Sequence, residues 1–315
     1  MTEDATCLEP DSDVIDLVIR ARPRDLGGFS VRRVLPFHRR RSVGPFVFLD
    51  RMGPATFAPG QGIDVRPHPH IGLATLTYLY EGAIFHRDSL GSALPILPGE
   101  VNWMVAGRGI VHSERTPADA LRDGQHLDGL QAWLALPLEH EDTSPSFEHH
   151  DRDALPTIDR DGATLTMVTG HGFGLTSPVT TFSPTLYADL RLMAGSSFVF
   201  GAEHEERAVY LAHGRIACGR GEDHAFEDGE LIVLKPGVEV ALHTDRDTRL
   251  MLLGGAPLDA PRLMEWNFVA SSPERMDAAR AAWRADHDHP HGQRPPERER
   301  RFGLVPGDDL DYIPY

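Results

Sequence analysis

Two short motifs in this sequence carry metal-binding side chains at a spacing that brings them together on a strand. One is a His-x-His motif at His68 and His70, and the other is a His-x-Glu motif at His112 and Glu114. Residues i and i+2 of a β-strand point to the same face of a sheet, so each motif presents a pair of ligands. Facing inward across a small barrel, the two pairs supply three imidazoles and one carboxylate. This set suits a borderline divalent metal such as iron and leaves octahedral positions open.

The chain contains 17 histidines, so some histidine pairs arise by chance and need not bind a metal. A second His-x-His motif, His289 and His291, lies among charged residues and prolines with no strand after it, and we interpret it as a solvated tail. We interpret the His149-His150 pair, in a polar stretch, in the same way. The pair at His68 and His70 differs because it opens an alternating, strand-like run at 73–80.

The composition predicts many short strands rather than a helical bundle. Hydrophobic residues make up 41% of the chain, and 30 glycines and 25 prolines punctuate it. Strand-like runs recur between Gly and Pro turns, which is typical of a sandwich or barrel. We therefore expect an all-β protein.

The strand series predicts two β-rich domains and a C-terminal extension. Residues 13–137 form the first domain, which carries both motifs, and the polar stretch 138–163 connects it to the second. Residues 164–270 repeat the order of strands and turns only weakly, which suggests duplication. Residues 271–315 follow as a helix, a linker and a docking tail.

The second domain lacks the paired ligands of the first. Its His204 stands beside two glutamates without an imidazole two residues away, and His243 is followed by Asp245 instead of a glutamate. We expect a metal-free barrel that is filled by side chains.

The C-terminal extension carries both a helix start and an apolar end. Ser272 and Pro273 have the residue types of an N-cap and a first helical position, and the apolar face continues to about Arg284. The segment 302–315 regains aromatic residues, so we expect it to dock on its own barrel or on a neighbouring molecule.

The charge and the cysteine content exclude several classes of protein. The net charge of −16 repels phosphate backbones, so we expect no direct binding to nucleic acid. The two cysteines, Cys7 and Cys218, are too few for a disulfide framework, which favours a reduced, cytoplasmic setting. An acidic N-terminus without an apolar core argues against a signal peptide, and no apolar run reaches the roughly 18 residues of a membrane span.

Several motifs resemble the pirin family over most of the chain. The similarity lies in the stretches around His68-Pro69-His70, Glu81-Gly82, Pro98-Gly99, Trp103-Met104, Ala106–Ile110, His112-Ser113-Glu114, Leu130–Trp133, Ser183–Tyr187 and Gly255–Leu258. The resemblance implies a bicupin of two stacked, antiparallel, jelly-roll-like β-barrels. It also implies one mononuclear metal, usually iron, in the N-terminal cupin.

Carried over by matching motif, the implied metal ligands are His68, His70, His112 and Glu114, the same set that the spacing proposes. One position departs from the family pattern, because Ala74 stands where pirin has a glutamate after the His-x-His motif. Glu114 then supplies the carboxylate. The expected metal is Fe(II), with Zn, Mn, Co, Ni and Cu left open.

The resemblance implies two different functions. In one, the protein is a dioxygenase that cleaves flavonols such as quercetin or other enolic small molecules with O₂, and Glu114 is both a ligand and the catalytic base. In the other, it is a non-catalytic redox sensor whose iron state changes its affinity for a partner protein. A cupin that keeps its metal only for stability is a third reading. We expect His86 to make a polar contact near the ligands and Trp103 to pack in the core.

Overall fold

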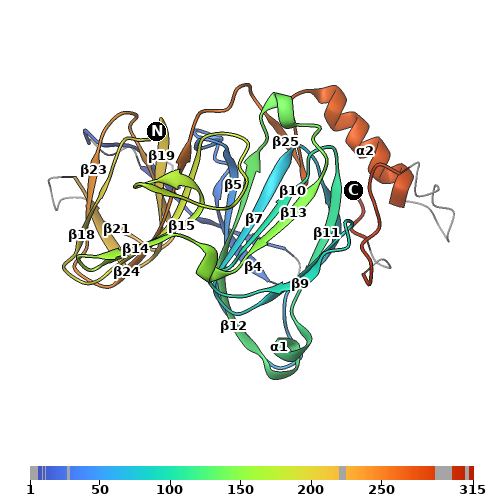
Figure 1. The fold of residues 1–315 in the computed structure, drawn as a ribbon, viewed down its shortest axis with the longest axis horizontal. Helices are drawn as coiled ribbons and strands as arrows, with labels where there is room; N and C mark the ends of the chain where they lie inside the picture. The colour runs from blue at the N-terminus through green and yellow to red at the C-terminus, as the bar shows by residue number, and fades with distance from the viewer. Residues whose placement is uncertain are drawn as a thin grey trace. The chain divides into compact units, whose positions relative to one another are not determined.

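The computed structural model of the chain describes residues 6–8, 10, 12–26, 29–219, 225–287, 300–308 and 312–315. These described residues form β-sheets with two α-helices (Figure 1), which confirms the all-β prediction. His289 and His291 lie outside the described residues. Within the described ranges, no helix is both long and apolar enough to cross a bilayer.

The chain divides into two compact units, and each combines segments that are distant in sequence. The histidine unit, named for its ligand motifs, consists of Asp25–Ser30, Arg51–His149 and Leu258–Tyr315. The companion unit consists of the remaining segments, Met1–Arg24, Val31–Asp50 and His150–Pro257. Four strands run from the sequence range of one unit into that of the other: β3 (Arg22–Asp25), β4 (Ser30–Leu35), β5 (Phe46–Phe57) and β13 (Ser146–His150).

The histidine unit holds the strands of both motifs and the C-terminal helix. Its other elements are β6 (Asp64–His70), β7 (Leu73–Glu81), β8 (Ile84–Asp88), β9 (Ala93–Ile96), β10 (Val101–Val105), β11 (Ile110–Arg115), α1 (Ala118–Asp123), β12 (Gln125–Ala135), η1 (Leu138–His140), β25 (Leu263–Glu265), β26 (Phe268–Ala270) and α2 (Pro273–His287).

Two antiparallel sheets build the barrel of the histidine unit. One contains the order β13-β10-β7-β12-β5, and the other has the order β6-β11-β8-β9. In the first sheet, β7 pairs with β10 on one side and with β12 on the other, and it is buried from Leu73 to Tyr80. Its Thr75 and Thr77 alternate with Leu76 and Tyr78, so the two threonines share one face of the sheet.

The companion unit is a second β-barrel whose described interior is apolar. Its elements are β1 (Cys7–Leu8), β2 (Ile15–Arg20), η2 (Arg152–Ala154), β14 (Thr157–Arg160), β15 (Ala163–Gly172), β16 (Leu175–Thr176), β17 (Thr185–Leu192), β18 (Ser197–Phe200), β19 (Glu206–His213), β20 (Arg215–Cys218), β21 (Ala225–Glu227), β22 (Glu230–Leu234), β23 (Val240–His243) and β24 (Thr248–Gly255). A single cluster of buried side chains, including Leu190, Phe200 and Leu252, occupies its core. The barrel is filled by side chains, as expected.

The C-terminal extension begins with the predicted helix. The backbone N–H of Arg275 donates a hydrogen bond to Ser272 Oγ at 3.4 Å, and Pro273 is the first residue of α2. The helix continues to His287, three residues beyond the expected end at Arg284, because Trp283 and Asp286 are both buried. The side chain of Asp286 accepts a hydrogen bond from the backbone N–H of Phe302, which ties the helix to the tail.

The described part of the tail packs on the histidine unit of the same chain. Phe302 and Val305 are fully buried, and they join Phe268, Trp283 and Val111 in one apolar cluster. Tyr312 and Tyr315 pack against that cluster. The described part of the tail therefore docks on its own chain, which is one of the two alternatives expected from the sequence.

Removing the tail after Arg301 is expected to destabilise the histidine unit. Burying a Phe or Val side chain contributes about 1.5–3 kcal/mol each, and both Phe302 and Val305 are fully buried. We expect the melting temperature to fall by several degrees and the dye ANS to bind the exposed apolar surface. Pro306→Ala, at an exposed position, is the control and should melt like the wild type. An unchanged melt of the truncated protein would contradict this prediction.

Candidate metal centre

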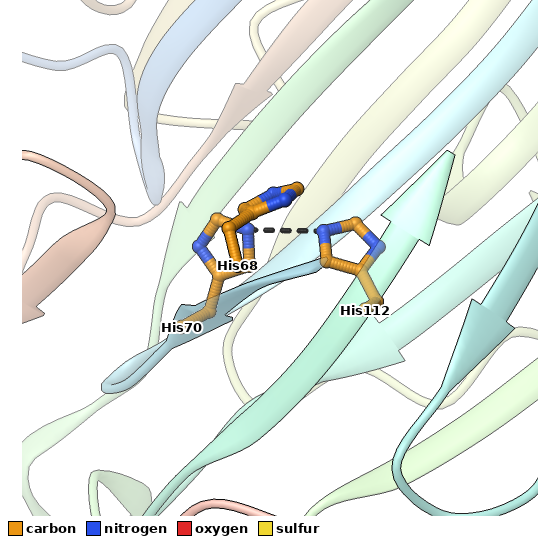
Figure 2. A group of neighbouring side chains, drawn as sticks. All are labelled: His68, His70 and His112. Carbon is orange, nitrogen blue, oxygen red and sulfur yellow. Dashed lines mark hydrogen bonds between the residues drawn. The ribbon is translucent and has the colours of Figure 1, made fainter. Parts of the chain in front are cut away.

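The ligand motifs lie on neighbouring strands of one sheet. His68 and His70 end β6, and His112 and Glu114 lie on β11. His112 is the register partner of His68 and Ile110 is that of His70. Cross-strand partners share a face of the sheet, so the three imidazoles project to the same side (Figure 2). The three histidines of the two motifs therefore lie on one face.

One detail of this arrangement differs from the sequence interpretation. The His68 and His70 pair does not open the strand at 73–80 but closes a strand of its own, β6. Gly72 separates β6 from β7 with a φ of +68°, a left-handed conformation that glycine adopts without a steric penalty. The chain can therefore turn directly after the second histidine.

The three imidazoles converge on one point. One ring nitrogen of each histidine lies within 4.8 Å of a ring nitrogen of both other histidines. Nε2 of His70 lies 3.1 Å from Nε2 of His112. All three side chains are buried, with at most 6% of each residue exposed. Figure 2 shows the rings of His70 and His112 edge to edge, with His68 beside them.

Backbone carbonyls fix the orientation of two of these rings. Nδ1 of His68 lies 2.8 Å from the carbonyl of Arg66, and Nδ1 of His70 lies 2.8 Å from the carbonyl of Asn267. A carbonyl only accepts, so both Nδ1 atoms carry the proton and both Nε2 atoms keep a free lone pair. The buried Nδ1 of His112 has no hydrogen-bond partner among the described residues.

Burial keeps the three imidazoles neutral. It lowers the pKa of His68 to about 4, and it lowers the pKa values of His70 and His112 well below the ordinary value. Repulsion from His68 adds to the effect on both of the other rings. Neutral imidazole is the form that binds a metal.

These residues fit a divalent metal. Nε2 of His68 and Nε2 of His70 are free acceptors in a buried group of three neutral imidazoles, which is the form of histidine that binds a metal. The 3.1 Å between the Nε2 atoms of His70 and His112 also suits neighbouring ligands of one ion, because metal–nitrogen bonds are about 2.0–2.1 Å long.

Glu114 stands beside the imidazole group but not within it. It follows His112 on the same face of β11, opposite His86, at a register shift between β11 and β6. Its Oε1 lies 3.5 Å from Oγ1 of Thr77, which in turn lies 2.8 Å from Oε1 of Gln131. Burial raises the pKa of the Glu114 carboxyl, against the lowering influence of His86 and Thr77.

His86 is buried next to the three imidazoles, on strand β8. Its ring centroid lies 5.4 Å from that of His112, and the ring stacks on Phe147 at 4.5 Å. Its Nε2 lies 3.0 Å from a carboxylate oxygen of Asp88, whose other oxygen accepts the backbone N–H groups of Leu90 and Ser92. The polar contact expected for His86 is therefore made by Asp88.

Sequence reasoning missed three of the side chains around the imidazoles: Asp88, Trp133 and Phe147. The Trp133 ring meets that of His70 edge-on at 5.1 Å. Asp88 was detectable in principle, because it stands two residues after His86 and shares its face of the strand. Trp133 and Phe147 gave no comparable signal, since their positions depend on how distant strands pair.

The other residues considered in the sequence lie elsewhere. Trp103 is buried in the core, as expected, and so is Ala74. His243 is exposed, and Nε2 of His204 lies 2.9 Å from the carbonyl of His171. Nδ1 of His149 lies 2.8 Å from the amide oxygen of Asn102, so this histidine is not simply solvated.

Comparison with known proteins establishes the family of this chain. A model described as Pirin matches residues 28–134, and one described as Pirin C-terminal cupin domain matches residues 187–288. A pirin-like protein of Caulobacter vibrioides is 49% identical over 288 residues, which are 89% of this chain and 98% of the relative. The chain belongs to the pirin family. The fold is accordingly the pirin bicupin.

Solved structures agree with this pirin assignment. A quercetin 2,3-dioxygenase from Acinetobacter baumannii is 32% identical and superimposes with a TM-score of 0.83, covering 95% of this chain and 94% of the other. The bacterial pirin YhhW from Escherichia coli, solved in complex with nickel(II), is 19% identical with a TM-score of 0.60, covering 76% of this chain and 96% of the other. The second comparison shows the pirin fold alone.

The metal-free pirin chain is expected to lose stability as the pH falls from 6.5 towards 4. Over this range the unfolded chain protonates its histidines, whereas folded His68, with a pKa of about 4, does not. Each such histidine contributes a slope of about 1.4 kcal/mol per pH unit. His70 and His112, whose pKa values are also lowered, add to it.

Urea unfolding of the metal-free protein at several pH values measures this slope. His68→Gln should make the slope shallower by about one proton, and His243→Gln, at an exposed position, should leave it unchanged. A His68→Gln protein whose stability follows the wild-type pH dependence would show that His68 is not held neutral.

Proposed function

We propose that this pirin is a metal-dependent dioxygenase that cleaves flavonols such as quercetin, or similar enolic small molecules, with O₂. The observation that carries the proposal is the convergence of three neutral, buried imidazoles beside the partly buried carboxylate of Glu114. The relative from Acinetobacter baumannii, which is similar over 95% of the chain, is named a quercetin 2,3-dioxygenase.

The proposed ligands are His68, His70, His112 and Glu114. The three histidines already meet, and Glu114 completes the set from the next inward-facing position of β11. We propose Fe(II) as the metal. Zn, Mn, Co and Cu suit the same nitrogen and oxygen donors, and so does nickel(II), which the Escherichia coli pirin structure contains.

Glu114 is also the proposed catalytic base. When bound, a divalent ion supplies open coordination positions and acidifies a hydroxyl group that approaches it. The Glu114 carboxylate then accepts the proton of the 3-hydroxyl group of the flavonol. In the metal-free chain, burial raises the pKa of this carboxyl. Oγ1 of Thr77 lies 3.5 Å from Oε1 of this carboxylate.

The remaining neighbours of the imidazoles would exclude water from a planar substrate. Trp133 and Phe147 bring aromatic surface to His70 and His86, respectively. We also propose a cytoplasmic location, which the two cysteines, Cys7 and Cys218, support as buried thiols.

Oxygen consumption by metal-analysed protein tests this proposal. Protein loaded with one Fe(II) per chain should consume O₂ with quercetin and other 3-hydroxyflavones. It should consume no O₂ with the matched flavones that lack the 3-hydroxyl group, because Glu114 then has no 3-hydroxyl proton to accept. If stoichiometric Fe(II) protein consumes no O₂ with flavonols or other enolic compounds, the enzyme proposal fails and the partner-binding alternative replaces it.

A further inference from the structure

One of the three imidazoles depends on a segment far away in the sequence. His68 is oriented by Arg66, two residues earlier on the same strand. His70 is instead oriented by the carbonyl of Asn267, which is 197 residues away. Nε2 of His70 faces His112, and among the described residues Nδ1 faces only this carbonyl, so the orientation of the ring depends on how the C-terminal segment docks.

The docking segment runs along β6 at several points. The backbone N–H of Val269 donates to the carbonyl of Ile71 at 3.2 Å, and that of Ile313 donates to the carbonyl of Pro67 at 2.9 Å. Ile71 also forms a parallel bridge with Phe268. The hydrogen bond at Pro67 therefore lies before His70 in the sequence, and the one at Ile71 lies directly after it.

Asn267 belongs to a strained two-residue turn. Trp266 and Asn267 connect β25 to β26, since Glu265 and Phe268 are paired. Trp266 has a φ of +52°, and a bulky residue in this left-handed region costs on the order of 1–3 kcal/mol. Such a conformation persists only where surrounding contacts impose it.

Aromatic packing supplies those contacts. The ring of Trp266 meets Phe268 edge-on at 5.3 Å and Tyr315 edge-on at 5.1 Å. The Tyr315 hydroxyl donates a hydrogen bond to Glu265, the residue that begins the turn. The last described residue of the chain therefore braces the turn from outside.

We propose that the Trp266-Asn267 turn is a positioning element of the metal centre. The Asn267 carbonyl holds His70 as the tautomer whose Nε2 is free to bind a metal, and the packing of Trp266 holds the carbonyl in place. Trp266 and Tyr315 are therefore positioning residues that act through His70. This inference rests on the proposed metal site, but its effect on the His70 ring exists without metal.

Histidine NMR on metal-free protein tests the first part directly. In ¹⁵N-histidine-labelled wild type, His70 should appear as the Nδ1–H tautomer with a slowly exchanging proton, a signal assigned by its absence in His70→Gln. Trp266→Ala should broaden or lose this signal. Asn267→Ala is the matched control, because it keeps the backbone carbonyl, and it should retain the signal.

Nickel(II) affinity, measured by competition with a chelator, tests the second part. Loss of a contact that orients a ligand typically weakens metal binding about 10–100-fold, so Trp266→Ala should bind Ni(II) more weakly by this factor and Asn267→Ala should not. If Trp266→Ala does not fold, Tyr315→Ala removes the same brace with the turn sequence intact and should give a smaller loss in both measurements.

Two results would overturn the inference, and a third would separate it from the proposed function. A wild-type His70 that is not the Nδ1–H tautomer would exclude the contact. An unchanged signal and affinity in both Trp266→Ala and Tyr315→Ala would show that the turn positions nothing. The predicted His70 signals, together with no Ni(II) binding by wild type, would support the contact and refute the metal site itself.

Discussion

Replacing His70 with alanine is expected to abolish metal retention. The change removes one of three converging nitrogens. Because perturbing a contact around a ligand already weakens binding about 10–100-fold, losing the ligand itself should cost more than 100-fold. Elemental analysis after purification in the presence of a chelator should find less than one-tenth of the wild-type metal.

His243→Ala is the control for this loss. His243 is exposed on the companion unit, and its removal should leave the metal content at the wild-type value. A His70→Ala protein that keeps one metal per chain would show that the assigned site is wrong, whatever the activity of the protein.

Replacing Glu114 with glutamine is expected to separate catalysis from metal binding. Glutamine preserves the shape of the side chain but cannot accept the substrate proton, and positioned acid–base groups contribute about 10²–10⁴-fold to rate. Turnover of a flavonol should fall by that factor, while much of the metal remains because the three histidines are intact. Oxygen uptake and metal content should be measured on the same preparation.

Glu139→Gln provides the matched control, since Glu139 is exposed in the histidine unit. It should retain wild-type turnover. If Glu114→Gln turns over at the wild-type rate with full metal, Glu114 is not the base, and the proton must pass to another group near the imidazoles.

The imidazole group was predictable because it depends on local rules. The alternation of side chains along a strand puts His68 beside His70 whatever the rest of the chain does. The meeting of the two motifs required only that two nearby strands pair, as β6 and β11 do. The helix start at Ser272 and Pro273 was also local, and the structure confirms it.

The surroundings of the imidazoles were not predictable in this way. Asn267 contributes a backbone carbonyl, which leaves no trace in the residue type and is brought to His70 from 197 positions away. Trp133 and Phe147 reach the histidines through strand pairings that the sequence does not specify. The end of α2 was misplaced for a similar reason: burial of Asp286 against the tail, not helix propensity, carries the helix onward.

The histidine unit is built from segments that lie far apart in the sequence, and this has a consequence for the synthesis of the chain. Both ligand strands lie before residue 116, yet the unit also requires Leu258–Tyr315. A nascent chain on the ribosome therefore exposes its imidazoles long before the segment that orients His70 has been translated. Loading with the correct metal should accordingly be a post-translational event, and ribosome-stalled chains that end before residue 258 should capture metal weakly and with little discrimination.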